Sequence, residues 1–252
     1  MSTEAVEHTP PEDPTDLGEI ELERVRLPEG ALVIIDGPSA GGKSLLGQKL
    51  GKRYGLPVYE GGTFNRVATV LAFERGADLT DPEVCGEIAR QVDFELVAGE
   101  DGSQRIIYQG RDITADCKTP EVSEACAIFS TYPESQKELY EKFVAEAGAG
   151  NAVLVGRMVG RWLLPDAPVK AFVTGKVSVR AARRGEPADS IHRRDMMDGR
   201  REHMPLRRAP DAKVFLNNEG TTFKALFCEV AAHFERGYGL EPSPLVKEHL
   251  AK

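Results

Sequence analysis

A glycine-rich stretch that ends in lysine and serine is the feature of this 252-residue chain best suited to chemistry. It fits the pattern GxxxxGK followed by Ser or Thr, and it consists of Gly37, Pro38, Ser39, Ala40, Gly41, Gly42, Lys43 and Ser44. Glycines let backbone amides turn toward phosphate oxygens, the lysine ammonium bridges the β- and γ-phosphates, and the serine hydroxyl ligates Mg²⁺. The stretch therefore predicts an ATP-binding P-loop. A plain glycine turn is the alternative, but it does not need all four signature positions.

Positive charge is concentrated in one part of an otherwise acidic chain. With 32 Lys and Arg against 40 Asp and Glu, the net charge is −8. This balance argues against a general nucleic-acid or membrane-surface binder, because affinity for phosphate backbones needs an excess of basic residues. The basic stretch contains Arg180, Arg183, Arg184, Arg193, Arg194, Arg200, Arg201, Arg207 and Arg208. Guanidinium groups bind phosphate oxygens in pairs, so this stretch is a second candidate for phosphate chemistry.

Strands that alternate with helices must position these groups. Short aliphatic runs predict buried strands at residues 32–35, 57–59, 152–155, 169–173 and 214–216. The P-loop lies between the first of these strands and a helix that we expect to end at Gly55. Parallel strands need crossover helices, so the pattern predicts an α/β fold with a five-stranded parallel sheet covered on both faces.

Other segments depart from this alternation. Residues 92–114 change to a period of two with a turn signal at Asp101-Gly102, which predicts a small antiparallel β insert. Asp81-Pro82 predicts a helix start, and the last helix is expected at 223–234. Residues 1–24 are rich in carboxylates and proline, which predicts a disordered acidic tail, although the alternation in 20–25 would also suit a short strand.

The remaining composition indicates a cytoplasmic protein. Cys85, Cys117, Cys126 and Cys228 are scattered without CxxC spacing, as expected for thiols in a reducing compartment rather than for a metal site. There is no apolar run long enough for a membrane span, and the N-terminus lacks the pattern of a signal peptide. Nothing in the sequence indicates an obligate protein partner.

From about Ala31 to Gly239 the order of motifs resembles that of the bacterial cytidylate kinases. The matching motifs are IDGPSAGGKS at 35–44, EGG with Arg66, TPEV at 119–122, Gly156-Arg157, LPDAPVK at 164–170, RDxxDxxR at 194–201 and Pro205-Leu206. The resemblance implies a P-loop kinase domain over 25–240, with an acceptor-binding lobe at about 61–135, a short lid at about 180–200 and a C-terminal tail at 241–252. It implies ATP and Mg²⁺ as cofactors, with Mg²⁺ on Ser44 and Asp36 behind it.

The resemblance also implies a role for each matching residue. Arg66, Arg157 and Arg201 match ligands of the acceptor phosphate, and Arg194 and Asp198 match residues that contact the sugar. Arg180 and Arg184 begin the lid and would cover the ATP phosphates. The implied catalytic groups are Lys43, Arg157, Arg194 and Arg201, and the implied acceptor site consists of Glu60, Gly61, Arg66, Gly156, Arg157, Met158, Asp198 and Arg201. Each arginine also has the alternative of being a solvated helix charge.

The residues that read cytosine in the family are changed in this chain. Gly61, Ala127, Gln136 and Met158 stand where the family has two serines, an arginine and an aspartate. Glu60 replaces an aspartate, and it could act as a base for a neutral acceptor or orient Arg66. We therefore expect transfer of the ATP γ-phosphoryl group to a nucleoside monophosphate, with CMP or dCMP as the default acceptor. The alternatives are a kinase for another nucleotide or phosphorylated metabolite, and a nucleotide-binding regulator without transfer.

Overall fold

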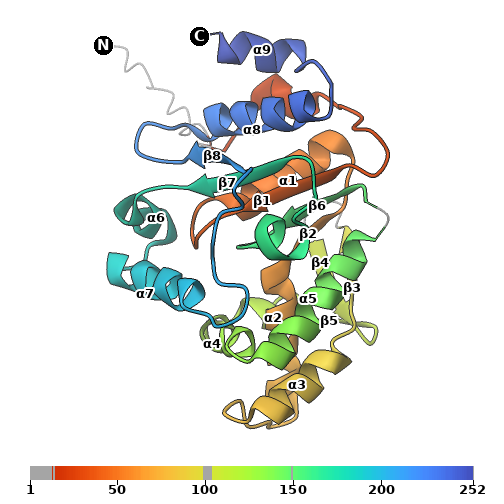
Figure 1. Cartoon of the computed structure of the whole chain (residues 1–252), viewed down its shortest axis with the longest axis vertical. Coiled ribbons are helices and arrows are strands. Elements are labelled where there is room, and N and C mark those ends of the chain that lie inside the picture. Colours follow the sequence, from red (N-terminus) through yellow and green to blue (C-terminus); the bar gives the residue numbers. More distant parts are fainter. Residues whose placement is uncertain (1–12, 14, 99–103, 149, 252) are drawn as a thin grey trace, which may run out of the picture.

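A parallel five-stranded sheet forms the centre of the molecule (Figure 1). The computed structural model describes residue 13 and residues 15–98, 104–148 and 150–251. In spatial order the strands are β2 (Val58–Glu60), β6 (Ala152–Val155), β1 (Leu32–Asp36), β7 (Lys170–Thr174) and β8 (Lys213–Leu216). All neighbouring strands are parallel. This confirms the predicted α/β sheet, with strand bounds within one residue of those expected.

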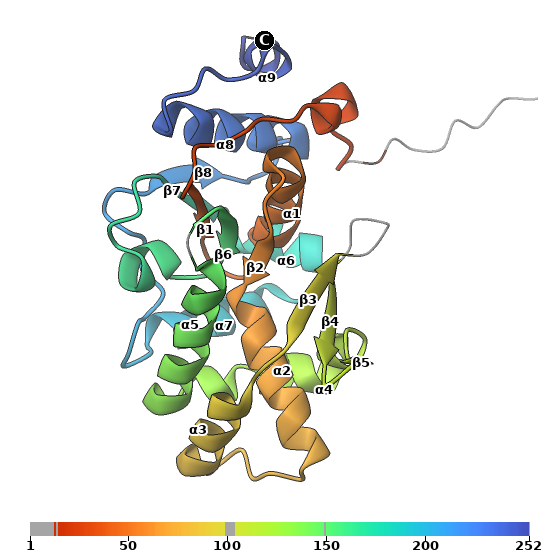
Figure 2. The ribbon, with the colours of Figure 1, turned by 90° about the vertical axis from the view of Figure 1, so that its right-hand side faces the viewer.

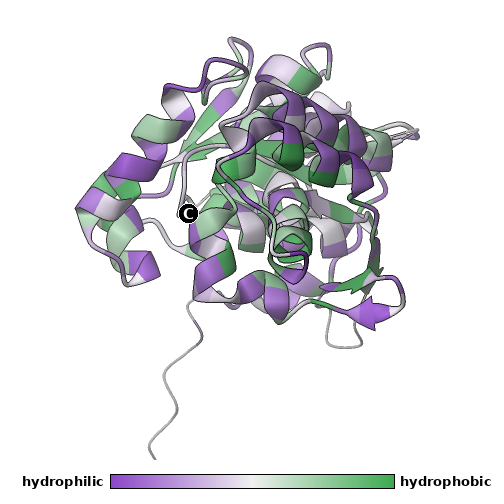
Figure 3. Cartoon of the chain, turned by 90° about the horizontal axis from the view of Figure 1, so that it is seen from below, coloured by the Kyte–Doolittle hydropathy of each residue, from purple (hydrophilic) through white to green (hydrophobic). Residues whose placement is uncertain are grey.

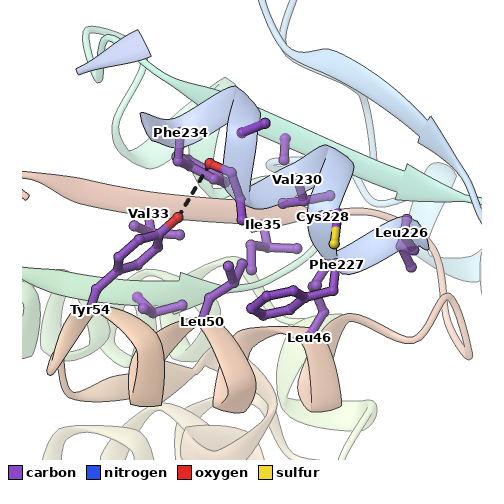
Figure 4. Packing of buried hydrophobic residues seen from close by; sticks show 14 of the residues in the cluster. Val33, Ile35, Leu46, Leu50, Tyr54, Leu226, Phe227, Cys228, Val230 and Phe234 are labelled. Carbon is purple, nitrogen blue, oxygen red and sulfur yellow. Dashed lines mark hydrogen bonds between the residues drawn. The ribbon is translucent and has the colours of Figure 1, made fainter. Parts of the chain in front are cut away.

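Side chains of β1 alternate between two apolar cores, one on each face of the sheet. Val33 and Ile35 belong to the core that contains α1 (Lys43–Tyr54) and α8 (Phe223–Gly237). Figure 4 shows Leu46, Leu50 and Tyr54 of α1 packed against Phe227, Val230 and Phe234 of α8. Ile34 belongs to the second core, with side chains of α2 and α5. Burial of both faces explains why the strand is a continuous aliphatic run.

The segment after β2 forms a lobe on the second face of the sheet, which we call the insert lobe (residues 61–147). Its helices are α2 (Gly61–Glu74), α3 (Pro82–Gln91), η2 (Asp116–Lys118), α4 (Pro120–Ala125), η3 (Ile128–Ser130) and α5 (Pro133–Ala147). A separate antiparallel sheet contains β3 (Glu95–Ala98), β4 (Gln104–Tyr108) and β5 (Arg111–Asp112), and it stands beside α2 in Figure 2. The predicted β insert is confirmed. Asp101-Gly102 lies outside the described residues.

The predicted helix signals of the insert lobe are present in the structure. The Asp81 carboxylate accepts the backbone amides of Glu83 and Val84 and so caps α3. The helices carry hydrophilic residues on one side and hydrophobic residues on the other (Figure 3).

No helix among the described residues is long and apolar enough to cross a bilayer. All four cysteines are free.

Two short helices follow β7 and contain most of the arginine-rich stretch. They are α6 (Val177–Arg184) and α7 (Ala188–Gly199), and they lie side by side next to the P-loop end of the sheet (Figure 1). Gly185, in the left-handed region at φ 66°, ends α6. The remaining element of this region, η4 (Val159–Leu163), follows β6 and contacts β1.

Both ends of the described chain differ from the expectation. The strand predicted within 20–25 is wrong, because the chain forms a 3₁₀ turn, η1 (Gly18–Leu22). Leu17 and Ile20, three residues apart, are buried, whereas Leu22 is 76% exposed. This spacing suits a turn and not a strand. Disorder is also wrong for the described residues from Leu17 onward, since they join the first core. At the other end, α8 continues to Gly237, and a further helix, α9 (Pro244–Leu250), buries Val246.

A buried ion-pair network joins both ends of the described chain to α1. The Arg53 guanidinium, on α1, pairs with Glu235 of α8 at 2.8 Å and with Glu23 at 3.1 Å. It also donates to the Ser243 hydroxyl at 2.7 Å. The Arg53 side chain is only 1% exposed and that of Glu235 is fully buried, so each charge is compensated by the other. The network fixes the helix that begins at the P-loop.

Candidate phosphate-transfer site

The P-loop leaves β1 at Asp36 and enters α1 at Lys43, as the sequence predicts. Gly37 has φ 148°, and a Cβ atom there would lie 2.0 Å from the Val173 carbonyl oxygen, so no other residue fits. Gly42 precedes α1 in the left-handed region at φ 90°. The loop, together with Arg183 and Arg184, lines a pocket of about 370 Å³, a size typical of ligand sites. The backbone thus presents the start of α1 to this pocket.

Polar groups distant in sequence hold the P-loop in place. The backbone amide and hydroxyl of Ser39 donate to Asp195 Oδ1 at 3.1 and 3.0 Å. Arg180 donates to the Ser39 carbonyl and the Gly175 carbonyl, both at 2.8 Å, and pairs with Asp195 at 2.7 Å. Asn217 donates to the Gly41 carbonyl at 3.1 Å. Our sequence reasoning missed the support from Asp195 and Asn217, although Asp195 lies within the RDxxDxxR motif.

This arrangement changes the expectation for Arg180. Arg180 is 4% exposed, its guanidinium already contacts three protein groups, and it does not line the pocket at the P-loop. Direct contact with ATP is therefore not favoured, and the residue supports the loop from the protein side. Arg184 does line the pocket, as expected, and so does Arg183, whose guanidinium donates to the carbonyls of Asn217 and Asn218.

Lys43 lies in an environment that disfavours its charge. Its ammonium donates to the Pro38 carbonyl at 2.7 Å. Burial lowers the pKa of Lys43 to about 7, and the nearby Arg157 guanidinium acts in the same direction, while Asp36 and Glu60 oppose the shift. An anionic phosphate placed next to this ammonium would offset the free-energy cost of burying the charged form of Lys43. The lysine is therefore prepared for a phosphate ligand and is not held by a carboxylate.

Two carboxylates end the strands β1 and β2, which lie on either side of β6, and they have different partners. Asp36 accepts the amides of Val159 at 2.9 Å and Gly160 at 2.7 Å, and burial raises the pKa of its carboxyl to about 6. Glu60 accepts the Ser44 hydroxyl at 2.7 Å. Since both oxygens of Asp36 are held by η4, the expected place of Asp36 behind Mg²⁺ is not favoured. Glu60 is the carboxylate that contacts the predicted metal ligand.

An arginine–aspartate cluster faces the P-loop from β6 and α7. Asp198 is 5% exposed, and one of its oxygens lies 2.5 Å from Arg157 Nη1 in an ion pair without hydrogen-bond alignment. Its other oxygen accepts from Arg201 Nη2, and Arg201 also donates to the Tyr140 hydroxyl at 3.4 Å. The structure thus brings together three predicted residues. Arg194 points elsewhere, to Glu186, which also pairs with Arg184.

The positive charges of Arg66 and three other predicted arginines all act on one group, the thiol of Cys126. Burial raises the pKa of this thiol, whereas the positive charges of Arg66, Arg157, Arg194 and Arg184 all act to lower it. The four guanidinium groups come from α2, the end of β6, α7 and α6, so the insert lobe and both short helices contribute positive charge to one region. Arg66 Nε is buried and has no partner among the described residues. Such a donor is available to an anion.

A small cavity beside this cluster contains most of the expected acceptor site. The lining residues are Gly61, Gly62, Asn65, Ser130, Tyr140, Phe143, Gly156, Arg157, Met158, Val159 and Arg201. Its volume of about 50 Å³ is well below the several hundred Å³ of ligand sites. In this conformation the cavity is therefore too small for a nucleotide.

Of the four positions at which this chain differs from the cytosine-reading residues of the family, two line the cavity and two do not. Met158 is buried and lines the cavity, as does Gly61. Gln136 is also buried, with Nε2 unpaired among the described residues, but it does not line the cavity, and neither does Ala127.

The part of the chain that the structure describes has no group of three or more His, Cys, Asp or Glu side chains suited to a metal ion. A cation here would depend on phosphate oxygens for most of its ligands.

Comparisons with known proteins agree with the motifs and the geometry. The family model described as cytidylate kinase matches residues 33–235. The cytidylate kinase of Bacillus subtilis (strain 168) is 32% identical over 193 residues, covering 71% of this chain and 86% of that protein. That of Carboxydothermus hydrogenoformans is 34% identical over 196 residues, covering 71% and 86%. That of Limosilactobacillus fermentum is 29% identical over 222 residues, covering 82% and 97%.

Proposed function

Because the chain belongs to the cytidylate kinase family, we propose that it transfers the γ-phosphoryl group of ATP to CMP or dCMP. An oxygen of the acceptor phosphate attacks the γ-phosphorus, the bond from that phosphorus to the β–γ bridging oxygen breaks, and ADP leaves. Both reactants are polyanions. The protein must therefore gather positive charge around two phosphate groups and hold them in line.

The observation that carries the proposal is the position of Arg157 relative to Lys43. The Arg157 guanidinium is close enough to lower the pKa of Lys43, although Lys43 begins α1 and Arg157 follows β6. In the free protein Asp198 partly neutralises Arg157 and Arg201. A cleft with a lysine at the P-loop and arginines opposite suits two phosphates that must meet. A mere ATP sensor would need only the P-loop.

Each group has a defined task in this proposal. The P-loop amides and Lys43 hold the ATP phosphates, while Arg157, Arg201 and Arg66 hold the acceptor phosphate through charge-assisted hydrogen bonds. Arg184 and Arg194 lie on α6 and α7, where an inward movement would cover the phosphates and exclude water. The acceptor phosphate is already ionised, so no general base is required. Glu60 then has a task other than proton removal.

Glu60 and Ser44 fit a site for Mg²⁺. The Ser44 hydroxyl is exposed at the start of α1, and the Glu60 carboxylate contacts it at 2.7 Å. Hydroxyl and carboxylate oxygens are suitable ligands, directly or through water. When bound, Mg²⁺ would neutralise negative charge on the ATP phosphates. Glu60 orients the hydroxyl and adds negative charge on the side of the cation.

A coupled assay of ADP release tests the proposal. Wild-type protein is incubated with MgATP and each of CMP, dCMP, UMP, AMP, GMP and dTMP, with Lys43→Ala as the inactive control. We expect turnover with CMP or dCMP well above that with the other acceptors. Turnover with a different acceptor alone would overturn the assignment of cytosine but keep a kinase. Absence of turnover across the panel, with ATP still bound, would indicate a regulator.

A further inference from the structure

The cavity beside Arg157 retains uncharged polar groups even though the expected base-reading positions are altered. Asn65 of α2 and Ser130 of η3 both line it, and Asn65 Nδ2 lies 2.5 Å from Ser130 Oγ. Ser130 is only 2% exposed. Phe143 and Met158 supply apolar walls to the same cavity. The two polar side chains therefore form one unit, which we call the Asn65–Ser130 pair.

The charged groups of the cavity are already engaged, because Arg157 and Arg201 both contact Asp198. The hydroxyls of Tyr140 and Ser130 each accept one hydrogen bond, from Arg201 and Asn65, and donate their own protons to no described residue. Ser130 differs from Tyr140 in having a free acceptor beside it, since no described residue donates to Asn65 Oδ1. A buried hydroxyl without an acceptor has an unmet hydrogen bond that a ligand can complete.

The hydrogen bond within the pair fixes what it offers to a ligand. Asn65 Nδ2 uses one of its two protons on Ser130, which leaves the amide oxygen as a free acceptor and the serine proton as a free donor. A donor therefore stands next to an acceptor. Cytosine carries the complementary edge, with the N3 acceptor next to the N4 amino donor. Uracil carries the reverse order, so its O4 would face the amide oxygen, which is repulsive.

We propose that the Asn65–Ser130 pair selects the acceptor base, with Ser130 donating to N3 and Asn65 Oδ1 accepting from the 4-amino group. This inference rests on the proposed function and names residues that determine its specificity. It places base recognition on α2 and η3, and it explains how the chain could select cytosine without the polar groups lost at Gly61 and Met158. The pair makes no contribution to the transfer step itself.

A substrate-analogue cycle tests the proposal. We would measure kcat/KM for CMP and for its 4-deamino analogue, the pyrimidin-2-one ribonucleoside 5′-monophosphate, with wild type and with Asn65→Ala. A buried hydrogen-bonding site rejects an analogue that lacks the matching group. We expect wild type to lose about 10- to 100-fold on removal of the amino group. In Asn65→Ala, we expect CMP to lose a similar factor and the analogue to remain within about threefold of CMP.

A matched control comes from the same lobe. Ser135 is fully buried, and its hydroxyl donates to the Phe129 carbonyl rather than into the cavity. Ser135→Ala should therefore keep the wild-type preference for CMP over its analogue, whereas Ser130→Ala should reduce it. Thermal melting of each variant checks that the fold is retained.

The results distinguish failure of the base-reading inference from failure of the proposed function. If wild type uses CMP but discriminates less than threefold against the analogue, the base-reading inference is overturned without reference to any variant. The same conclusion follows if Asn65→Ala discriminates as strongly as wild type. If wild type transfers no phosphate to CMP, the proposed function falls first and the inference falls with it.

Discussion

Nucleotide binding should draw a proton onto Lys43. Burial and the Arg157 charge hold the pKa of this lysine at about 7 in the empty site, compared with an ordinary value of 10.5. Phosphate oxygens favour the ammonium form, so the pKa must rise when ATP binds. Since the free state has the lower pKa, protons are taken up at any pH between the two values.

The size of this effect follows from the pKa. At pH 8 only about one tenth of the free protein carries the ammonium at Lys43, so binding should take up about 0.9 proton per site. The affinity for ATP should fall as the pH rises, by about fivefold from pH 7 to 8 and by nearly tenfold from pH 8 to 9. The pH of 8 is chosen because the ATP phosphates and Asp36 are then fully ionised.

Titration calorimetry measures the uptake directly. The binding enthalpy of MgATP at pH 8 is compared in Tris and in HEPES, whose ionisation enthalpies differ, and the slope gives the number of protons exchanged. Lys43→Met should take up none while retaining weak binding. Equal enthalpies in both buffers for wild type would refute the reasoning, because Lys43 would then hold the same proton in both states.

Further predictions concern the acceptor side, the metal and the fold. At pH 6.5, where most of Lys43 is already protonated, Arg157→Ala should raise the KM for CMP by about 10- to 100-fold and keep the dissociation constant for ATP within about twofold of wild type. Arg193→Ala, at an exposed position, should change neither quantity. Unchanged acceptor kinetics in Arg157→Ala would remove Arg157 from the site. Glu60→Gln should raise the Mg²⁺ concentration needed for half-maximal activity, because a negative charge next to Ser44 is lost. It should also weaken the binding of Mn²⁺ in the presence of ATP, which electron paramagnetic resonance measures. Unaltered Mn²⁺ binding would contradict this prediction. Arg53→Met should lower the free energy of unfolding by about 3–5 kcal/mol, because the buried Glu235 is left without its partner. Urea denaturation measures this free energy. A loss below about 1 kcal/mol would show that the network is not structurally important.

The sheet and the P-loop were accessible from the sequence because their signals are local. A buried aliphatic run followed by glycines and a lysine constrains strand, turn and helix within a dozen residues. The start of α3 at Asp81 and the end of α1 at Gly55 follow from the conformations that those residue types favour. The positions of the five strands were predicted correctly for the same reason.

Contacts between distant segments were not accessible. Ser39 and Asp195 are 156 positions apart, and nothing near either residue indicates the other. Within the arginine-rich stretch the sequence does not separate Arg180, buried against the P-loop, from Arg193, which is exposed. The altered acceptor positions could be listed, but the Asn65–Ser130 pair depends on how α2 meets η3.

The network around Arg53 sets limits on how this protein can be shortened or fused. Glu23 and Ser243 approach the same guanidinium from opposite ends of the described chain, so both of these ends are tied to the helix that follows the nucleotide-binding loop. A deletion that removes Leu17 or Ser243 should loosen the packing of α1 and weaken ATP binding at a distance. Affinity tags at either end therefore need linkers that leave residues 17–250 intact.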